Sequence, residues 1–233
     1  MRLRGRRTCV ECGEDWSYFE TGDVACPGCG SLHSVARDEA PARHTVGHDE
    51  LDLTAARAAA ADEPLATVAA LAADAARSFL AGRGFVDAGA LQPLDDVTVA
   101  AAELRTVADR VRRSLAPDDD AEWYLLELLR GAPDGERPDV PAGWRAARGL
   151  AVATVVDRYR LAVARILDDG PDDSDARRAL GTLRDHLRRL EALDGDVPVE
   201  ASDRLLAAAR DLGDYCRGDE GALARAEDRL SRV

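Results

Sequence analysis

The sequence contains no lysine, because all 31 basic residues among its 233 are arginine. Such a chain can supply neither the lysine of a phosphate-binding loop nor a Schiff base, and it has no lysine to act as a general base. The patterns G-x-S-x-G, H-E-x-x-H and G-x-G-x-x-G are missing as well. These absences exclude or leave unsupported most familiar catalytic classes. We therefore expect a protein that is not an enzyme and has no small-molecule substrate.

The sequence also lacks an apolar run of the kind that crosses a membrane. In the apolar segment 149–167, the charged residues Asp157, Arg158, Arg160 and Arg165 interrupt the roughly 20 apolar residues that a spanning helix needs. No apolar stretch of signal-peptide length follows the basic start MRLRGRR. We expect a cytoplasmic protein without membrane association.

Aromatic residues are scarce, at 4%, and the 44 carboxylates give a formal net charge of -13. This composition, dominated by alanine, aspartate and arginine, resembles that of proteins from salt-loving archaea. Clustered surface carboxylates keep a protein hydrated when salt screens the repulsion between charges. We expect a halophilic archaeal protein whose acidity requires no cationic partner.

Four of the five cysteines form two knuckles of the form C-x2-C-G, Cys9 with Cys12 and Cys26 with Cys29, separated by thirteen residues. This spacing is typical of a zinc site. Each knuckle places two thiolates on one tight turn, and the following glycine tolerates a positive φ. Four thiolates close a tetrahedral structural site with no open position for water. We predict one zinc ion per chain.

Residues 1–37 are predicted to form a small β zinc ribbon, with short strands at 15–19, 24–26 and 31–35 around a turn at 20–23. A hairpin of this size buries too little apolar surface to offset its chain entropy. Metal binding is then expected to supply the folding free energy, on the order of 10 kcal/mol. Removing one cysteine should unfold the ribbon.

Residues 38–53 show no sustained periodicity and are predicted to be a linker, and residues 54–233 have helical periodicity. Apolar positions three and four apart predict six or seven helices, with 144–167 as the central one. The acidic triplet 118–120 and the pair Asp172 and Asp173 are predicted to begin helices as capping residues. The expected fold class is mainly α, a β ribbon followed by an all-α bundle.

Residues 9–30 resemble the zinc ribbons of transcription-factor-type and ribosomal proteins, and also the rubredoxin-like module of rubrerythrins. The whole chain resembles a haloarchaeal family of uncharacterised zinc-ribbon proteins. The rubrerythrin resemblance would imply a di-iron bundle with Glu-x-x-His pairs, but the chain has no such pair. Iron also accepts four thiolates, so a rubredoxin-like iron electron carrier is the alternative to zinc.

Arg2, Arg4, Arg6 and Arg7 form a basic segment that is a candidate for contacts with nucleic-acid phosphates. The aromatic residues at 16, 18 and 19 could stack on bases, but most of them are expected to cover the metal knuckles as the core of the ribbon. The leading hypothesis is a non-enzymatic recognition module. Its expected partner is a protein, with a transcription-related nucleic acid as the alternative.

Two further candidates are weaker. His44 and His48 have an H-x3-H spacing but lie in the predicted linker without a cysteine partner. Cys216 lies on the apolar stripe of a helix and is expected to be a buried core residue rather than a reactive thiol. Neither adds a predicted site.

Overall fold

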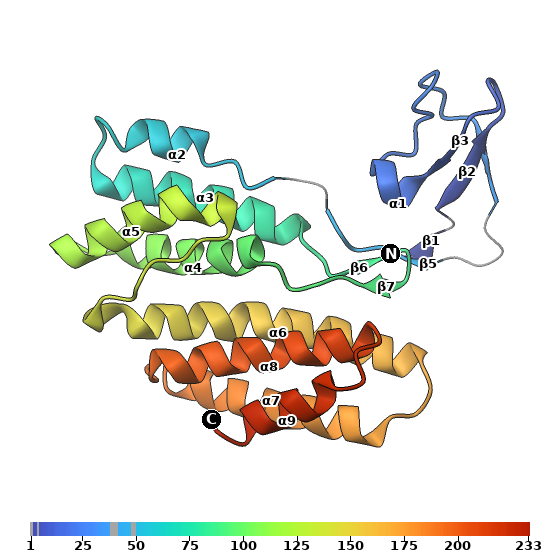
Figure 1. Ribbon diagram of the computed structural model, residues 1–233. Helices are drawn as coiled ribbons and strands as arrows, with labels where there is room; N and C mark the ends of the chain where they lie inside the picture. The colour runs from blue at the N-terminus through green and yellow to red at the C-terminus, as the bar shows by residue number, and fades with distance from the viewer. Residues whose placement is uncertain (1, 4, 38–41, 48–49) are drawn as a thin grey trace. The chain divides into compact units, whose positions relative to one another are not determined.

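Figure 1 shows a computed structural model of the protein, which describes residues 2–3, 5–37, 42–47 and 50–233. The chain divides into two compact units. The first consists of Met1–His48 and Gly82–Gln92, and the second of Asp49–Ala81 and Pro93–Val233. The chain therefore passes between the units three times. The fold class is the expected one, a mainly α protein with a small N-terminal β region.

The ribbon in the first unit is a three-stranded antiparallel sheet in the order β3-β2-β4. Its strands are β2 (Arg6–Cys9), β3 (Asp15–Ser17) and β4 (Ser34–Ala36). The central strand β2 was not among the predicted strands, because its partners lie farther along the chain. Residues 24–26, predicted as a strand, form none: Val24 and Ala25 are bends and Cys26 is irregular.

The predicted strand at 15–19 ends early, at Ser17. The Ser17 hydroxyl accepts a hydrogen bond from the N–H of Phe19 at 3.2 Å and caps the short helix α1 (Tyr18–Thr21). Gly22, with φ 70°, ends this helix in the left-handed conformation. A serine cap and a glycine stop outweigh the strand propensity of the aromatic residues between them.

The segment predicted as a linker contributes to the first unit. Strand β5 (Ala42–Arg43) pairs with β1 (Arg2–Leu3), and the N–H of Thr45 donates to the carbonyl of Val86 at 2.8 Å. Val86 belongs to a hairpin of β6 (Val86–Asp87) and β7 (Ala90–Leu91). Helical periodicity had predicted that the residues of this hairpin belong to the helical domain.

His44 joins this hairpin to the ribbon. Its side chain is only 7% exposed, and Nδ1 lies 2.7 Å from Oδ1 of Asp87. The rings of Tyr18 and Phe19 pack against the imidazole with centroid distances of 5.1 and 5.2 Å. His44 therefore has a packing role, and His48 lies outside the described residues.

Eight α-helices follow within 54–233: α2 (Thr54–Ala59), α3 (Leu65–Gly82), α4 (Asp96–Val111), α5 (Asp119–Gly131), α6 (Arg145–Asp169), α7 (Ser174–Ala192), α8 (Val199–Cys216) and α9 (Ala222–Leu230). Two 3-10 turns, Ala132–Asp134 and Ala142–Trp144, precede α6. The helix beyond the predicted six or seven is α2, whose six residues are too few to show a repeating apolar stripe.

Helix α6 is central in the helical unit, as predicted, because it packs against α4, α7 and α8 (Figure 1). Aspartate side chains begin three of the helices: Asp95, Asp118 and Asp173 accept hydrogen bonds from the N–H groups of residues 98, 121 and 176. The predicted capping roles of the acidic triplet and of Asp173 are therefore present.

One helix within the described residues, α3, is long and apolar enough to cross a membrane by length and composition alone. Part of its surface is buried in the structure, including Val68, Ala72 and Phe79. The core helix of a globular unit meets the same criterion. The segment 149–167, considered from the sequence, is a different one.

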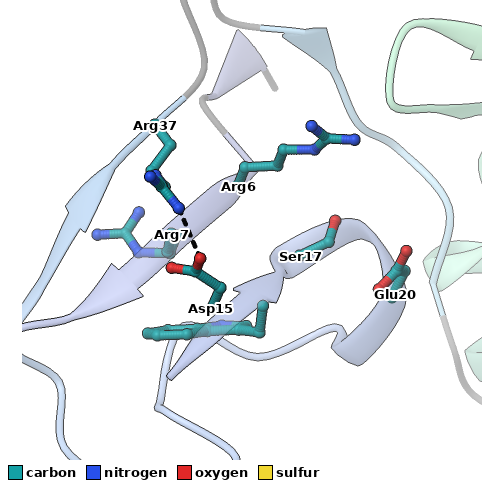
Figure 2. A pocket seen from close by; sticks show the side chains of 7 residues that line it. Arg6, Arg7, Asp15, Ser17, Glu20 and Arg37 are labelled. Carbon is teal, nitrogen blue, oxygen red and sulfur yellow. Dashed lines mark hydrogen bonds and ion pairs between the residues drawn. The ribbon is translucent and has the colours of Figure 1, made fainter. Parts of the chain in front are cut away.

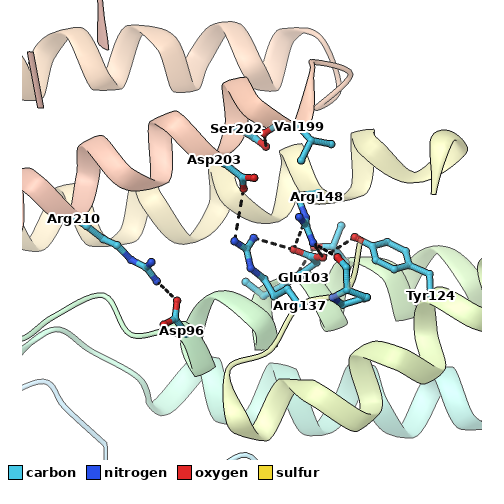
Figure 3. A network of polar contacts seen from close by, with 12 residues as sticks. Asp96, Glu103, Tyr124, Arg137, Arg148, Val199, Ser202, Asp203 and Arg210 are labelled. Atoms are coloured by element: carbon cyan, nitrogen blue, oxygen red, sulfur yellow. Dashed lines mark hydrogen bonds and ion pairs between the residues drawn. The ribbon is translucent and has the colours of Figure 1, made fainter. Parts of the chain in front are cut away.

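The helical core also contains a buried polar network, shown in Figure 3. Glu103 of α4 is fully buried and accepts hydrogen bonds from the Tyr124 hydroxyl at 2.6 Å and from Arg148 at 2.9 and 3.0 Å. Arg137 donates to the same carboxylate at 3.2 Å and lies 3.6 Å from Asp203 of α8. This network links α4, α5, α6 and α8 around one carboxylate.

The ionisation of this network is fixed by its surroundings. Burial and the Glu103 carboxylate raise the pKa of Tyr124, so the phenol stays protonated and donates. Burial would lower the pKa of Arg148, but attraction to Glu103 outweighs burial and raises it. Every charge in this network has an opposite charge or a hydrogen-bond donor within reach.

Candidate metal centre

The two cysteine knuckles have the same backbone construction. In the first, the N–H of Gly13 donates to the carbonyl of Cys9 at 3.1 Å, and in the second the N–H of Gly30 donates to that of Cys26 at 2.8 Å. Gly13 and Gly30 have φ values of 75° and 74°, the left-handed conformation that favours glycine. The glycine in each C-x2-C-G motif is therefore a requirement of the turn.

The four sulfur atoms of Cys9, Cys12, Cys26 and Cys29 all lie within 4.8 Å of one another. Two sulfur pairs join the two knuckles, Cys9 with Cys29 and Cys12 with Cys26, each at 3.5 Å. Sulfurs at about 2.3 Å from a tetrahedral zinc ion are about 3.8 Å apart. The donor set and its spacing therefore fit a single metal ion held by four sulfurs.

The cluster is buried on one side and open on the other. Cys9 and Cys26 are each 2% exposed and form a small apolar core with Trp16, whereas Cys12 and Cys29 are exposed. Trp16 thus covers the knuckles, as predicted. Tyr18 and Phe19 contact His44 instead of the cysteines.

Hydrogen bonds and neighbouring sulfurs shift the thiol pKa values in opposite directions. The backbone N–H of Cys12 is the main cause that lowers the pKa of Cys9 to about 7. The N–H of Glu14 favours ionisation of Cys12, but the nearby sulfurs of Cys29 and Cys26 outweigh it and raise the pKa of Cys12. Four thiolates this close repel one another, and a bound cation is what would relieve the repulsion.

A polar groove of about 570 Å³ lies on the ribbon sheet, and Figure 2 shows its lining. Arg6 and Arg7 of β2 line it together with Arg37, which follows β4, and with Asp15, Trp16, Ser17 and Glu20. Arg37 donates to Asp15 at 2.5 Å, and Arg7 donates through Nε to the Ser34 hydroxyl at 2.7 Å. We call this surface the arginine groove.

The arginine groove contains only part of the predicted basic segment. Arg6 and Arg7 line it, Arg2 belongs to β1 and Arg4 lies outside the described residues. Sequence reasoning missed Arg37, which lies about thirty positions away. The pairing of β2 with β4 brings it close, and its N–H donates to the carbonyl of Arg6 at 2.9 Å. Of the predicted basic segment, Arg6 and Arg7 belong to the central strand β2.

Exposed apolar side chains gather on the ribbon. Four of the nine large exposed apolar residues among the described ones lie there: Val10, Val24, Leu32 and Val35. Val10 lies within the first knuckle and is 67% exposed, and Leu32 follows the second and is 68% exposed. The N–H of Val10 donates to the carbonyl of His33 at 2.9 Å, so these two segments are adjacent. We call Val10 and Leu32 the knuckle tips.

Cys216 lies far along the chain from the cluster, near the end of α8. It is half-buried rather than fully buried, and burial raises the pKa of its thiol to about 11. A thiol with a raised pKa is mostly protonated and is a poor nucleophile. The expectation of an unreactive thiol fits this environment, although the full burial that we expected is wrong.

Residues 1–230 match the model of a family of unknown function, DUF7117. Neither the comparison with curated proteins nor the comparison with solved structures gives a match.

Proposed function

Since the chain belongs to DUF7117, a family of unknown function, we propose its role from the site itself: a non-enzymatic ribbon, held together by one zinc ion, that recognises a protein partner. The observation that carries this proposal is the cluster of four cysteine sulfurs on two glycine-terminated knuckles. A site closed by four sulfurs offers no open position for a substrate or a water molecule. Such a metal ion stabilises a fold and does no chemistry.

The knuckle tips support the protein partner. Large apolar side chains exposed beside one another favour association with another protein surface. The charge distribution also supports a protein partner for the ribbon. The first unit carries 7 arginines and 8 carboxylates, so the second unit carries most of the net charge of -13. Electrostatic repulsion from another acidic surface is therefore weakest at the nearly neutral ribbon, which favours the ribbon as the docking surface.

Affinity capture with the full-length protein tests this role. The double substitution Val10→Ser and Leu32→Ser is expected to weaken partner binding at least about tenfold, because anchor residues carry most of an interface's binding free energy. Quantitative mass spectrometry of the captured proteins measures the loss.

The matched control is Leu115→Ser, which also removes one exposed apolar side chain but lies outside the ribbon unit. A partner retained by the wild type and by Leu115→Ser, but lost by the double variant, is the expected result. Capture of the same proteins by all three variants would contradict the proposal.

The arginine groove favours a second candidate role, contact with single-stranded nucleic acid. Three guanidinium groups line the groove, and both Nη atoms of Arg7 are unused by any hydrogen bond among the described residues. Guanidinium groups bind phosphate oxygens through paired donors. Asp15 and Glu20 in the same lining reduce the local positive charge, and they make this role secondary.

Fluorescence anisotropy with a labelled single-stranded oligonucleotide, measured across a salt series, tests this second role. Each phosphate contact contributes a salt slope of about 0.7, so replacing Arg7 and Arg37 by Gln should reduce the slope by about 1.4. The control replaces Arg184 and Arg188 of α7 by Gln, the same change in charge on exposed residues of the helical unit. Equal affinities and slopes for both double variants would rule out the groove.

A further inference from the structure

A second groove lies within the helical unit, between the C-terminal half of α7, the loop 193–198 and the beginning of α8. Its volume is about 460 Å³, and Val233 also lines it. Ligand sites for small molecules have volumes of about 300 to 1,000 Å³ and are lined mainly by apolar side chains with a few polar groups. We propose that this groove, here called the α7–α8 groove, binds a small amphipathic carboxylate, an acyl chain with an anionic head.

The lining of the α7–α8 groove is mainly apolar. Leu190 and Leu205 are almost fully buried and form its inner surface, while Leu193 is 47% exposed. Val197 and Pro198 of the connecting loop add further apolar surface. An acyl chain placed here would remove both its own surface and that of Leu193 from water, at about 25 cal/mol for each Å² of apolar area.

Two arginines and a histidine lie in the same lining as this apolar surface. The guanidinium of Arg189 has no hydrogen bond or ion pair among the described residues, whereas most other arginines of this unit hold a carboxylate or a carbonyl oxygen. Arg204 uses one amino group, which donates to the carbonyl of Arg232 at 3.0 Å. His186 is the only histidine of the helical unit, and it lies in the same lining.

One of the two acidic side chains of the groove is already paired outside it. Asp196 is held at 2.5 Å by Arg145, which is not part of the lining, so Glu200 is the acidic side chain left without an ion pair there. Two guanidinium groups therefore lie in the same lining as one side-chain carboxylate without an ion pair. The guanidinium of Arg189 is the group that complements an anionic head group.

The shape and chemistry of the groove favour a carboxylate on an apolar chain over other anions. A guanidinium binds a carboxylate through two parallel hydrogen bonds, and one free guanidinium suffices for one head group. A nucleic acid would need aromatic stacking surfaces, and the lining contains no tryptophan, tyrosine or phenylalanine.

NMR titration of the full-length protein with sodium octanoate tests the proposal. The imidazole signals of His186, assigned through the variant His186→Gln, report occupancy from within the groove. We expect a saturable shift with octanoate and at least about tenfold weaker binding of octanol and octylammonium, which share the chain but lack the anionic head.

Matched variants locate the site. Arg189→Gln is expected to weaken octanoate binding about tenfold, because it removes a charge-assisted hydrogen bond to the head group. Arg188→Gln makes the same substitution one position earlier on an exposed residue outside the lining, and it should bind as the wild type does. Leu193→Ser, at a partly exposed position, should weaken octanoate and octanol alike.

Several outcomes would overturn the proposal. These are the absence of a His186 shift at millimolar octanoate, equal binding of all three probes, or equal weakening by Arg188→Gln and Arg189→Gln. Because the α7–α8 groove lies in the helical unit, none of these results depends on the metal site or on the ribbon's partner.

Discussion

Replacing Cys9 by serine is expected to abolish metal binding and to unfold the ribbon. A serine hydroxyl stays protonated at neutral pH and does not replace a thiolate as a ligand. Structural zinc sites in small domains contribute on the order of 10 kcal/mol to folding, and Cys9 and Cys26 together with Trp16 form the only buried apolar cluster beside the sheet among the described ribbon residues. Without the ion, this small core cannot offset the chain entropy of the ribbon.

Elemental analysis and an absorption spectrum measure the metal, and limited proteolysis within residues 5–37 measures the folding of the ribbon. We expect one zinc per chain and no visible colour for the wild type, and neither metal nor protease resistance for the variant. Cys216→Ser is the matched control, because it makes the same atomic change outside the cluster. It should keep the full metal content.

Two results would change this interpretation. One zinc per chain and an intact ribbon in Cys9→Ser would contradict a four-sulfur site. One iron per chain, with visible charge-transfer absorption in the wild type, would replace structural zinc by a rubredoxin-like electron carrier in the same cluster.

Replacing Glu103 by alanine is expected to destabilise the helical unit by about 3 to 5 kcal/mol. The loss arises because the substitution removes the counter-charge of Arg148, whose side chain is 8% exposed, and leaves the Tyr124 hydroxyl without its acceptor. A buried charge without a counter-charge costs free energy because it has lost its hydration and gains no ion pair in exchange. Figure 3 shows how the donors converge on this one side chain.

Urea unfolding followed by far-UV circular dichroism measures this effect, since most of the helical signal comes from this unit. Glu122→Ala is the control, because Glu122 is exposed on α5 and should change the free energy of unfolding by no more than about 0.5 kcal/mol. If Glu103→Ala and Glu122→Ala unfold at the same urea concentration, the network contributes no stability beyond that of a surface residue.

The features that the sequence predicted well depend on residues near one another in the chain. The knuckles are such a case, because the glycine after each cysteine pair sets the turn within five residues. The helices are another case, because their apolar stripes repeat within each helix. The capping side chains of Asp118 and Asp173 accept hydrogen bonds from N–H groups only three residues later in the chain.

Glu103 shows where this local reasoning ends. Its position in an amphipathic helix gave no sign of full burial, because its partners come from α5, from α6 and from the segment between them. Periodicity assigns a residue to a helix and a face, but not to a partner on another helix. The same limit applies to the α7–α8 groove, whose two sides are separate helices joined by a turn.

The sequence by itself determined the four cysteines that could hold a metal ion, the mainly α fold class and the capped starts of α5 and α7, because turns, caps and helical periodicity are set by neighbouring residues. Only the tertiary structure decided that Arg6–Cys9 is the central strand, that Arg37 joins Arg6 and that the hairpin at 86–91 packs on His44. These are pairings across long stretches of chain. They are selected by burial and hydrogen bonding in the folded protein, and no single segment contains the information to specify them.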